Sequence, residues 1–184
     1  MSPSKVTTEI LRDLSPTLQH LNHHNAYDPI PIDLLVSCTS LISLRAYQRF
    51  SSEHLCRIAR SLPLTSLHIL GNTVTDEVIP LFGKLESLYL TGSMLLTGES
   101  LRFLPSLTSL TLVGPSAITR DNLSVLTNLL SLHIGNNEWL TNDTLSNFSL
   151  LTSLVANFCS VTEEIRTLLP NLVKLSVVTL GTLI

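Results

Sequence analysis

The stretch that decides the fold is LTSLHILGNTV, residues 64–74, because its first six residues recur along the chain. Each copy has a leucine, two variable residues, a second leucine, one variable residue and a third apolar residue in most cases. The copies begin at Leu41, Leu64, Leu85, Leu107, Leu129, Leu151 and Leu172. Successive starts lie 23, 21, 22, 22, 22 and 21 residues apart. A period of this length indicates a solenoid of stacked repeats.

Each repeat is predicted to contain a strand, a turn and a short helix. The leucines of LxxLxL alternate as in a strand that buries one face. A second pattern is an apolar residue followed by threonine, and this threonine precedes the first leucine of the next repeat by ten residues. The residues after the threonine have apolar side chains at helical spacing. We therefore predict an α/β solenoid of strand-and-helix repeats, with a curved parallel β-sheet on the concave face and short helices on the convex face.

The threonines of the second pattern are predicted helix N-caps, because a hydroxyl can accept a hydrogen bond from a free backbone N–H. They are Thr75, Thr97, Thr119, Thr141 and Thr162. Two residues later stand Glu77, Glu99, Asp121, Asp143 and Glu164. A carboxylate there stabilises a helix N-terminus by roughly 0.3 to 1 kcal/mol. With Asp76 and Glu163, seven of the fourteen acidic residues are interpreted as caps rather than as a cation site.

These motifs resemble the leucine-rich-repeat superfamily, whose consensus is LxxLxLxxN/CxL. Residues 64–74 match it throughout, and residues 151–161 match it with Ala156 at an apolar place and Cys159 at the Asn/Cys place. The longer turns look like the cysteine-containing subclass common in F-box adaptors. Departures are the short repeats, the absence of a preceding F-box, and Ser93 and Pro115 at the Asn/Cys place. The resemblance covers roughly residues 41–178 and implies a protein-binding scaffold.

Two domains are expected, a helical cap in residues 1–40 and the repeat array in residues 41–184. Val6, Ile10, Leu11 and Leu14 suggest an amphipathic cap helix. Residues 18–21 could be a degenerate extra strand, with Ile32, Leu35, Val36 and Cys38 as its helical half. The end, residues 175–184, is apolar and uncharged. We expect either a fragment of a longer protein or an edge that pairs in a homodimer.

Composition argues against several classes of function. The chain has a net charge of −3 and its 11 Lys and Arg residues are scattered, which disfavours nucleic-acid binding. No stretch resembles ~20 consecutive apolar residues or a signal core, so we expect an intracellular protein, cytoplasmic or nuclear, without a membrane partner. The three cysteines lack CxxC spacing, which predicts reduced thiols without a disulfide framework or zinc site.

No motif for catalysis is present. The sequence has no GxSxG turn and no glycine-rich phosphate loop. His20 and His24 could lie one helical turn apart, but no HExxH glutamate or cysteine pair accompanies them, so we interpret them as part of a polar cap face. We predict that the chain is not an enzyme and holds neither metal nor cofactor.

Function is expected on the concave face, where outward residues of adjacent strands form columns. Two residues after each first leucine, serine recurs six times and Lys174 closes the series. The columns at the fourth and sixth positions are varied. Their candidates for binding a partner protein are Arg45, Tyr47, His68, Tyr89 and His133, since tyrosine and arginine are frequent interface anchors. Alternatively, small polar residues simply tolerate a solvated face and the larger ones are incidental.

The predicted function is a non-enzymatic protein-protein interaction module whose partner is unknown. Alternatives are the substrate-recognition part of a ubiquitin ligase, an enzyme inhibitor, and a structural protein that self-associates, or continues its array, through the apolar C-terminal edge. A ubiquitin-ligase role would require an F-box or adaptor-binding segment outside this sequence.

Overall fold

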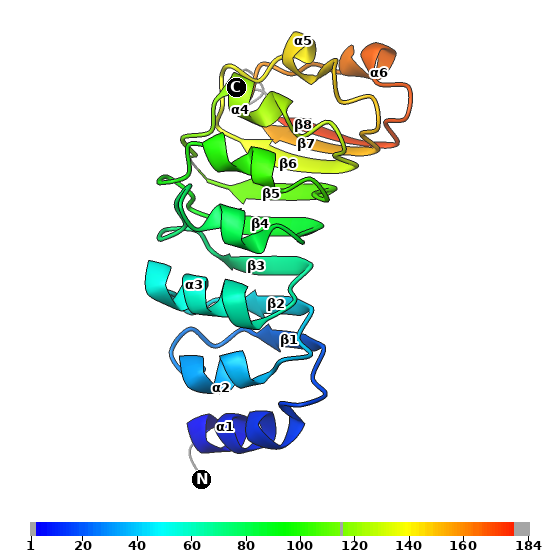
Figure 1. Cartoon of the computed structure of the whole chain (residues 1–184). Helices are drawn as coiled ribbons and strands as arrows, with labels where there is room; N and C mark the ends of the chain where they lie inside the picture. Colours follow the sequence, from blue (N-terminus) through cyan, green and yellow to red (C-terminus); the bar gives the residue numbers. More distant parts are fainter. Residues whose placement is uncertain (1–2, 115, 179–184) are drawn as a thin grey trace.

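The computed structural model describes residues 3–114 and 116–178, which form one sheet of eight parallel strands in chain order (Figure 1). Each strand pairs with the next along the chain. The strands are His20–His23 (β1), Ser43–Ala46 (β2), Ser66–Leu70 (β3), Ser87–Thr91 (β4), Ser109–Val113 (β5), Ser131–Gly135 (β6), Ser153–Asn157 (β7) and Lys174–Val178 (β8). The predicted α/β repeat architecture is confirmed.

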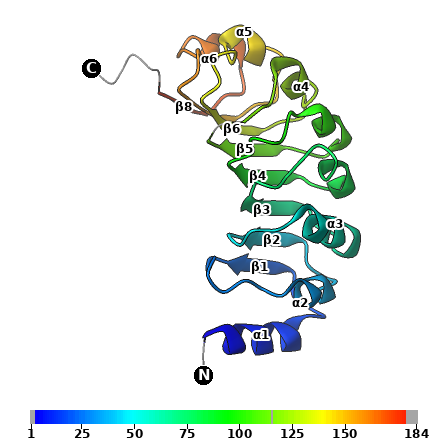
Figure 2. The ribbon, with the colours of Figure 1, turned by 90° about the vertical axis from the view of Figure 1, so that its left-hand side faces the viewer.

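Short helices lie on the opposite side of the molecule and, apart from the first, connect consecutive strands. They are Pro3–Leu14 (α1), Ile32–Ser37 (α2), Ser52–Ser61 (α3), Ile79–Phe82 (η1), Glu99–Phe103 (η2), Arg120–Ser124 (α4), Asn142–Leu145 (α5) and Ile165–Leu168 (α6). Figure 2 shows the sheet on the inner side of the bend and the helices on the outer side. None of the helices in residues 3–114 and 116–178 has the length and apolar content needed to cross a bilayer.

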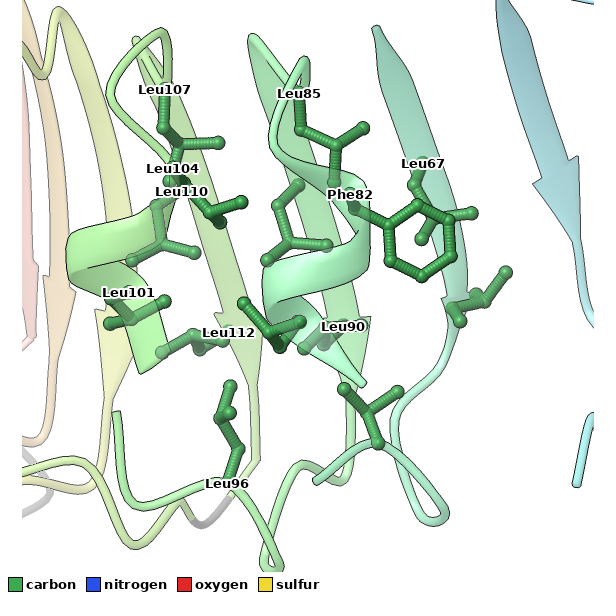
Figure 3. Close-up of a cluster of buried hydrophobic side chains, with 14 of the residues drawn as sticks. Leu67, Phe82, Leu85, Leu90, Leu96, Leu101, Leu104, Leu107, Leu110 and Leu112 are labelled. Atoms are coloured by element: carbon green, nitrogen blue, oxygen red, sulfur yellow. The ribbon is translucent and has the colours of Figure 1, made fainter. Parts of the chain in front are cut away.

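The core lies between the sheet and the helices, and its leucines stack from repeat to repeat. Leu88 pairs in register with Leu67 on one side and with Leu110 on the other. All three are at most 2% exposed. Figure 3 shows Leu67 and Leu110 of the strands between the sheet and the helices, together with the helix residues Phe82 and Leu101. Burial of each such side chain contributes roughly 1.5 to 3 kcal/mol, so the alternation of LxxLxL is what holds the array together.

The helix N-caps follow the prediction in two repeats. Thr119 and Thr141 accept hydrogen bonds from the backbone N–H groups of Asn122 and Thr144, as expected of N-caps. Glu99, Asp121 and Asp143 also lie in the first turn of their helices, as predicted.

The cap prediction is wrong for Thr75, Thr97 and Thr162, where the N-caps are Val78, Gly98 and Glu164. Two of these threonines are engaged by the preceding repeat instead. The Thr97 hydroxyl donates to Asp76, and the Thr162 hydroxyl accepts from the Asn142 amide. The segments η1 and η2 are 3₁₀ helices, a form common in such short pieces.

The first forty residues contain one helix and one further strand-and-helix pair. Strand β1 pairs with β2, with Leu21 opposite Leu44. Leu35 and Cys38 are buried, with α2 packing on α3. In α1, Leu11 is buried, whereas Ile10 and Leu14 are 52% and 45% exposed. The side chain of Val6 lies outside the described part of the chain.

The other end of the sheet is less covered. The inward residues Leu175 and Val177 of β8 are half-buried, while the corresponding Leu154 and Ala156 of β7 are at most 1% exposed. Val173, beside β8, is 76% exposed. Residues 179–184 of the apolar end lie outside the described part of the chain. Among the described residues, no strand pairs with the outer edge of β8, and apolar side chains beside this edge are exposed.

Candidate binding face

The strand register confirms the predicted serine column and the column at the fourth position. Each column runs across the sheet at about the usual 4.8 Å strand spacing. The serine column is Ser43, Ser66, Ser87, Ser109, Ser131 and Ser153, followed by Lys174. The column at the fourth position is Arg45, His68, Tyr89, Thr111, His133, Val155 and Ser176. At the sixth position, Leu70, Thr91 and Val113 are in register, as are Gly135, Asn157 and Val178.

Four rings of the concave face lie against one another at its N-terminal end. The centroids of His24 and Tyr47 are 5.3 Å apart, and those of Tyr47 and His68 are also 5.3 Å apart. His68 and Tyr89 stack at 3.6 Å with an interplanar angle of 15°. We call His24, Arg45, Tyr47, His68 and Tyr89 the aromatic cluster. It is a continuous ring surface across β1 to β4.

Arg45 is held within this cluster by the phenol of Tyr47. Its Nη2 donates a hydrogen bond to Tyr47 Oη at 2.7 Å, and its guanidinium carbon lies 5.5 Å from the Tyr47 ring centroid. The latter distance is within the range of a cation–π contact. Its Nε is buried without a hydrogen-bond partner among the described residues. The contacts with Tyr47 therefore hold the guanidinium in place, while its Nε–H has no acceptor among the described residues.

The imidazole of His68 is neutral at physiological pH. Burial, together with the electrostatic effect of the neighbouring Arg45 and His24, lowers the pKa of His68 to about 4. Its Nε2 is buried and has no hydrogen-bond partner in the described part of the chain. Burial also lowers the pKa of His133. The histidines of the fourth column therefore act as polar aromatic groups, not as cations.

A pH dependence of stability follows from the state of His68. Unfolded His68 binds a proton below about pH 6.5, but folded His68 does so only near pH 4. The folded chain should therefore lose about 1 kcal/mol of stability as pH falls through this window, a figure discounted for partial exposure. Urea unfolding at pH 7 and pH 4.5 measures the loss, which His68→Gln should reduce. An NMR titration of His68 near pH 6.5 would contradict the prediction.

The structure brings four of the five predicted site residues together. Arg45, Tyr47, His68 and Tyr89 belong to the aromatic cluster, whereas His133 lies in the same column beside Thr111 and Val155. His133 is thus separated from the cluster by the Thr111 strand.

His24 belongs to the cluster and was missed as a site residue. It lies six residues after Leu18, the same interval that separates Tyr47 from Leu41. Counting residues 18–23 as a full repeat would therefore have placed His24 in the sixth column.

The idea that His20 and His24 lie one helical turn apart is wrong, because residues 20–23 form β1. Alternation along this strand buries His23 at 8% exposure. Among the described residues, no group of three or more His, Cys, Asp or Glu side chains is arranged to hold a metal ion.

Comparison with known proteins supports the fold. No protein-family model matches the chain. No curated protein matches it. Three solved structures from Listeria monocytogenes are similar in fold. The internalin inlF has a TM-score of 0.65 at 24% identity, and the match covers 93% of this chain and 53% of that one.

Two further internalins from the same organism give similar values. Internalin C2 (inlC2) has a TM-score of 0.64 at 21% identity, covering 95% of this chain and 77% of that one. The functional domain of InlJ has a TM-score of 0.61 at 20% identity, covering 94% of this chain and 36% of that one. The chain thus spans about half the length of the first of these structures. Its fold is the leucine-rich-repeat solenoid that it shares with the internalins.

Proposed function

We propose that this chain is a non-enzymatic protein-interaction module that binds a partner protein through the aromatic cluster of its concave face. The observation that carries the proposal is the ring surface formed by His24, Tyr47, His68 and Tyr89, with Arg45 hydrogen-bonded to Tyr47. The remaining candidate, His133, would contact a partner that extends further along the face.

The cluster has the physical properties of an interface anchor. Tyrosine and arginine carry a large share of binding energy at protein interfaces. Rings that already stack on one another lose little side-chain freedom when a partner binds, which lowers the entropic cost of association. Across β5 to β8, by contrast, the fourth column holds Thr111, His133, Val155 and Ser176, with His133 its one ring. The anchor is therefore expected at the N-terminal half of the face.

The test is a double substitution, Tyr47→Ala with Tyr89→Ala. Affinity capture from the native source with mass spectrometry identifies proteins retained by the wild-type chain. A purified partner is then expected to bind the double variant at least about tenfold more weakly, as loss of two anchors implies. The matched control is Ser176→Ala, in the same column but at the opposite end of the sheet from the cluster. Unchanged affinity of the folded tyrosine variant would refute this binding face.

A second candidate function is self-association through the open edge of β8. It is favoured by the half-buried Leu175 and Val177 and by the 76% exposure of Val173. An uncovered parallel strand with apolar neighbours can pair with another strand edge. Sedimentation velocity over a wide concentration range should show concentration-dependent dimers, weakened by Val173→Glu. A monomer at every concentration would exclude this candidate and leave the proposal for the concave face intact.

A further inference from the structure

The outward columns of the strands carry positive charge, whereas the chain as a whole is negative. The chain has fourteen acidic and eleven basic residues, for a net charge of −3. The columns of outward residues on β1 to β8 nevertheless contain no Asp or Glu, and their charged members are Arg45 and Lys174. A concave surface of one sign concentrates its field and attracts ligands of the opposite sign.

Arg45 is a half-buried cation without a carboxylate partner. In the described part of the chain, the ion pairs are Arg57 with Asp33 and Arg166 with Glu163, and neither pair includes a residue of the concave columns. A charge that is partly removed from water without an opposite charge is costly, and a ligand that supplies one recovers the loss. Guanidinium groups pair with carboxylates through two parallel N–H donors.

Hydroxyl groups beside Arg45 extend this polar strip. Ser43 and Ser66 occupy the neighbouring column in register with one another. Both residues are partly exposed and no hydrogen bond from either hydroxyl is present among the described residues, so the hydroxyls can donate to an incoming carboxylate or backbone carbonyl. Next to this strip lies the His68 and Tyr89 stack, which offers a flat ring face.

We propose, building on the function proposed above, that the partner binds through an acidic segment. A carboxylate of that segment pairs with Arg45, and a neighbouring apolar or aromatic side chain covers the Tyr89 and His68 rings. The cation and the rings adjoin, so the segment carries both groups close together in sequence. A basic segment is disfavoured because the concave columns have no carboxylate to receive it.

The test uses two fluorescein-labelled peptides of alternating Glu and Tyr or alternating Gln and Tyr, with binding followed by fluorescence anisotropy. The wild-type chain is expected to bind the Glu peptide about tenfold more tightly than the Gln peptide, as for one charge-assisted pair. This preference should shrink at high ionic strength, because salt screens a half-exposed pair. Arg45→Gln should remove the preference, whereas Arg45→Lys should retain part of it.

The matched control is Lys174→Gln, which removes the other cation of the columns about 29 Å away at six strand spacings. It should leave the preference unchanged. Equal binding of the two peptides, no binding of either, or a preference that survives in folded Arg45→Gln would overturn the inference. Failure here is distinct from failure of the proposed function. If the tyrosine double variant loses a natural partner but Arg45→Gln does not, the binding face stands and the acidic segment is wrong.

Discussion

Replacing Leu110 by alanine is expected to lower the free energy of unfolding by about 3 to 5 kcal/mol. Leu110 is fully buried on β5, an interior strand of the sheet, with Leu88 and Leu132 in register on either side. Backbone ladders on both flanks fix the spacing of these strands, so the cavity left by the smaller side chain cannot collapse. Urea denaturation followed by far-UV circular dichroism measures the loss.

The matched control is Ser109→Ala, one residue earlier on the same strand but facing outward. It is expected to change stability by about 0.5 kcal/mol or less, as for most surface substitutions. Because each repeat contacts its neighbours, the Leu110 variant should also lose more amide protection in β4 to β6 than in α3. A Leu110 variant as stable as the Ser109 variant would show that the leucine layer does not hold the array together.

The fold could be predicted because every repeat carries the same pattern of inward-facing apolar residues. A single LxxLxL stretch is compatible with several folds, but seven copies at nearly constant spacing require strands of equal length placed side by side. Leu67, Leu88 and Leu110 then fall in one inward layer without any knowledge of long-range contacts. Consistent local patterns of this kind are what specify a structure.

The helix caps could be predicted only in part, because some of them cross between repeats. Asp76 lies in the repeat before η2, and its carboxylate reaches the start of η2 across the stack. Asp76 directly follows Thr75, so rules based on neighbouring residues assign Asp76 to η1, the helix of its own repeat. The separation of 24 residues between Asp76 and Ser100 is invisible to rules that consider four or five neighbouring residues.

The candidate site could be predicted as a set of columns but not as a cluster. Alternation placed Arg45, His68 and Tyr89 in one column. Ring stacking depends on side-chain rotamers, so the contact of Tyr47 with His24 could not be inferred. His24 was missed because its repeat has His23 where the others have an apolar residue, which weakens the motif. Whether the cluster binds a partner stays a prediction.

Asp76→Ala is the second substitution with a large expected effect, a loss of about 2 to 3 kcal/mol of stability, the scale of a lost cap with charge-assisted hydrogen bonds. The carboxylate accepts from the backbone N–H groups of Thr97, Gly98 and Ser100. It also accepts from the hydroxyls of Thr97 and Ser100. Ser100 is 2% exposed, so water cannot replace the lost acceptor there.

The acid dependence of stability is an independent test of the hydrogen bonds that Asp76 accepts. Burial raises the pKa of Asp76, but the hydrogen bonds from Ser100 and Thr97 outweigh burial and lower the pKa below its ordinary value of 3.8. The stabilisation is therefore present above about pH 3.8 and is lost as pH falls through the lower folded pKa. Asp76→Asn should remove this part of the acid-induced loss, because an amide cannot take up the proton.

Glu77→Ala is the matched control, since Glu77 is the next residue and is exposed. It is expected to change stability by about 0.5 kcal/mol or less. Urea unfolding of the three variants at pH 7 and at pH 3 separates a cap between repeats from a general effect of acidic charge. If Glu77→Ala costs as much as Asp76→Ala, the stabilisation comes from negative charge near the helices. If Asp76→Ala alone is costly, hydrogen bonds from one repeat to the next fix the start of η2 in the solenoid.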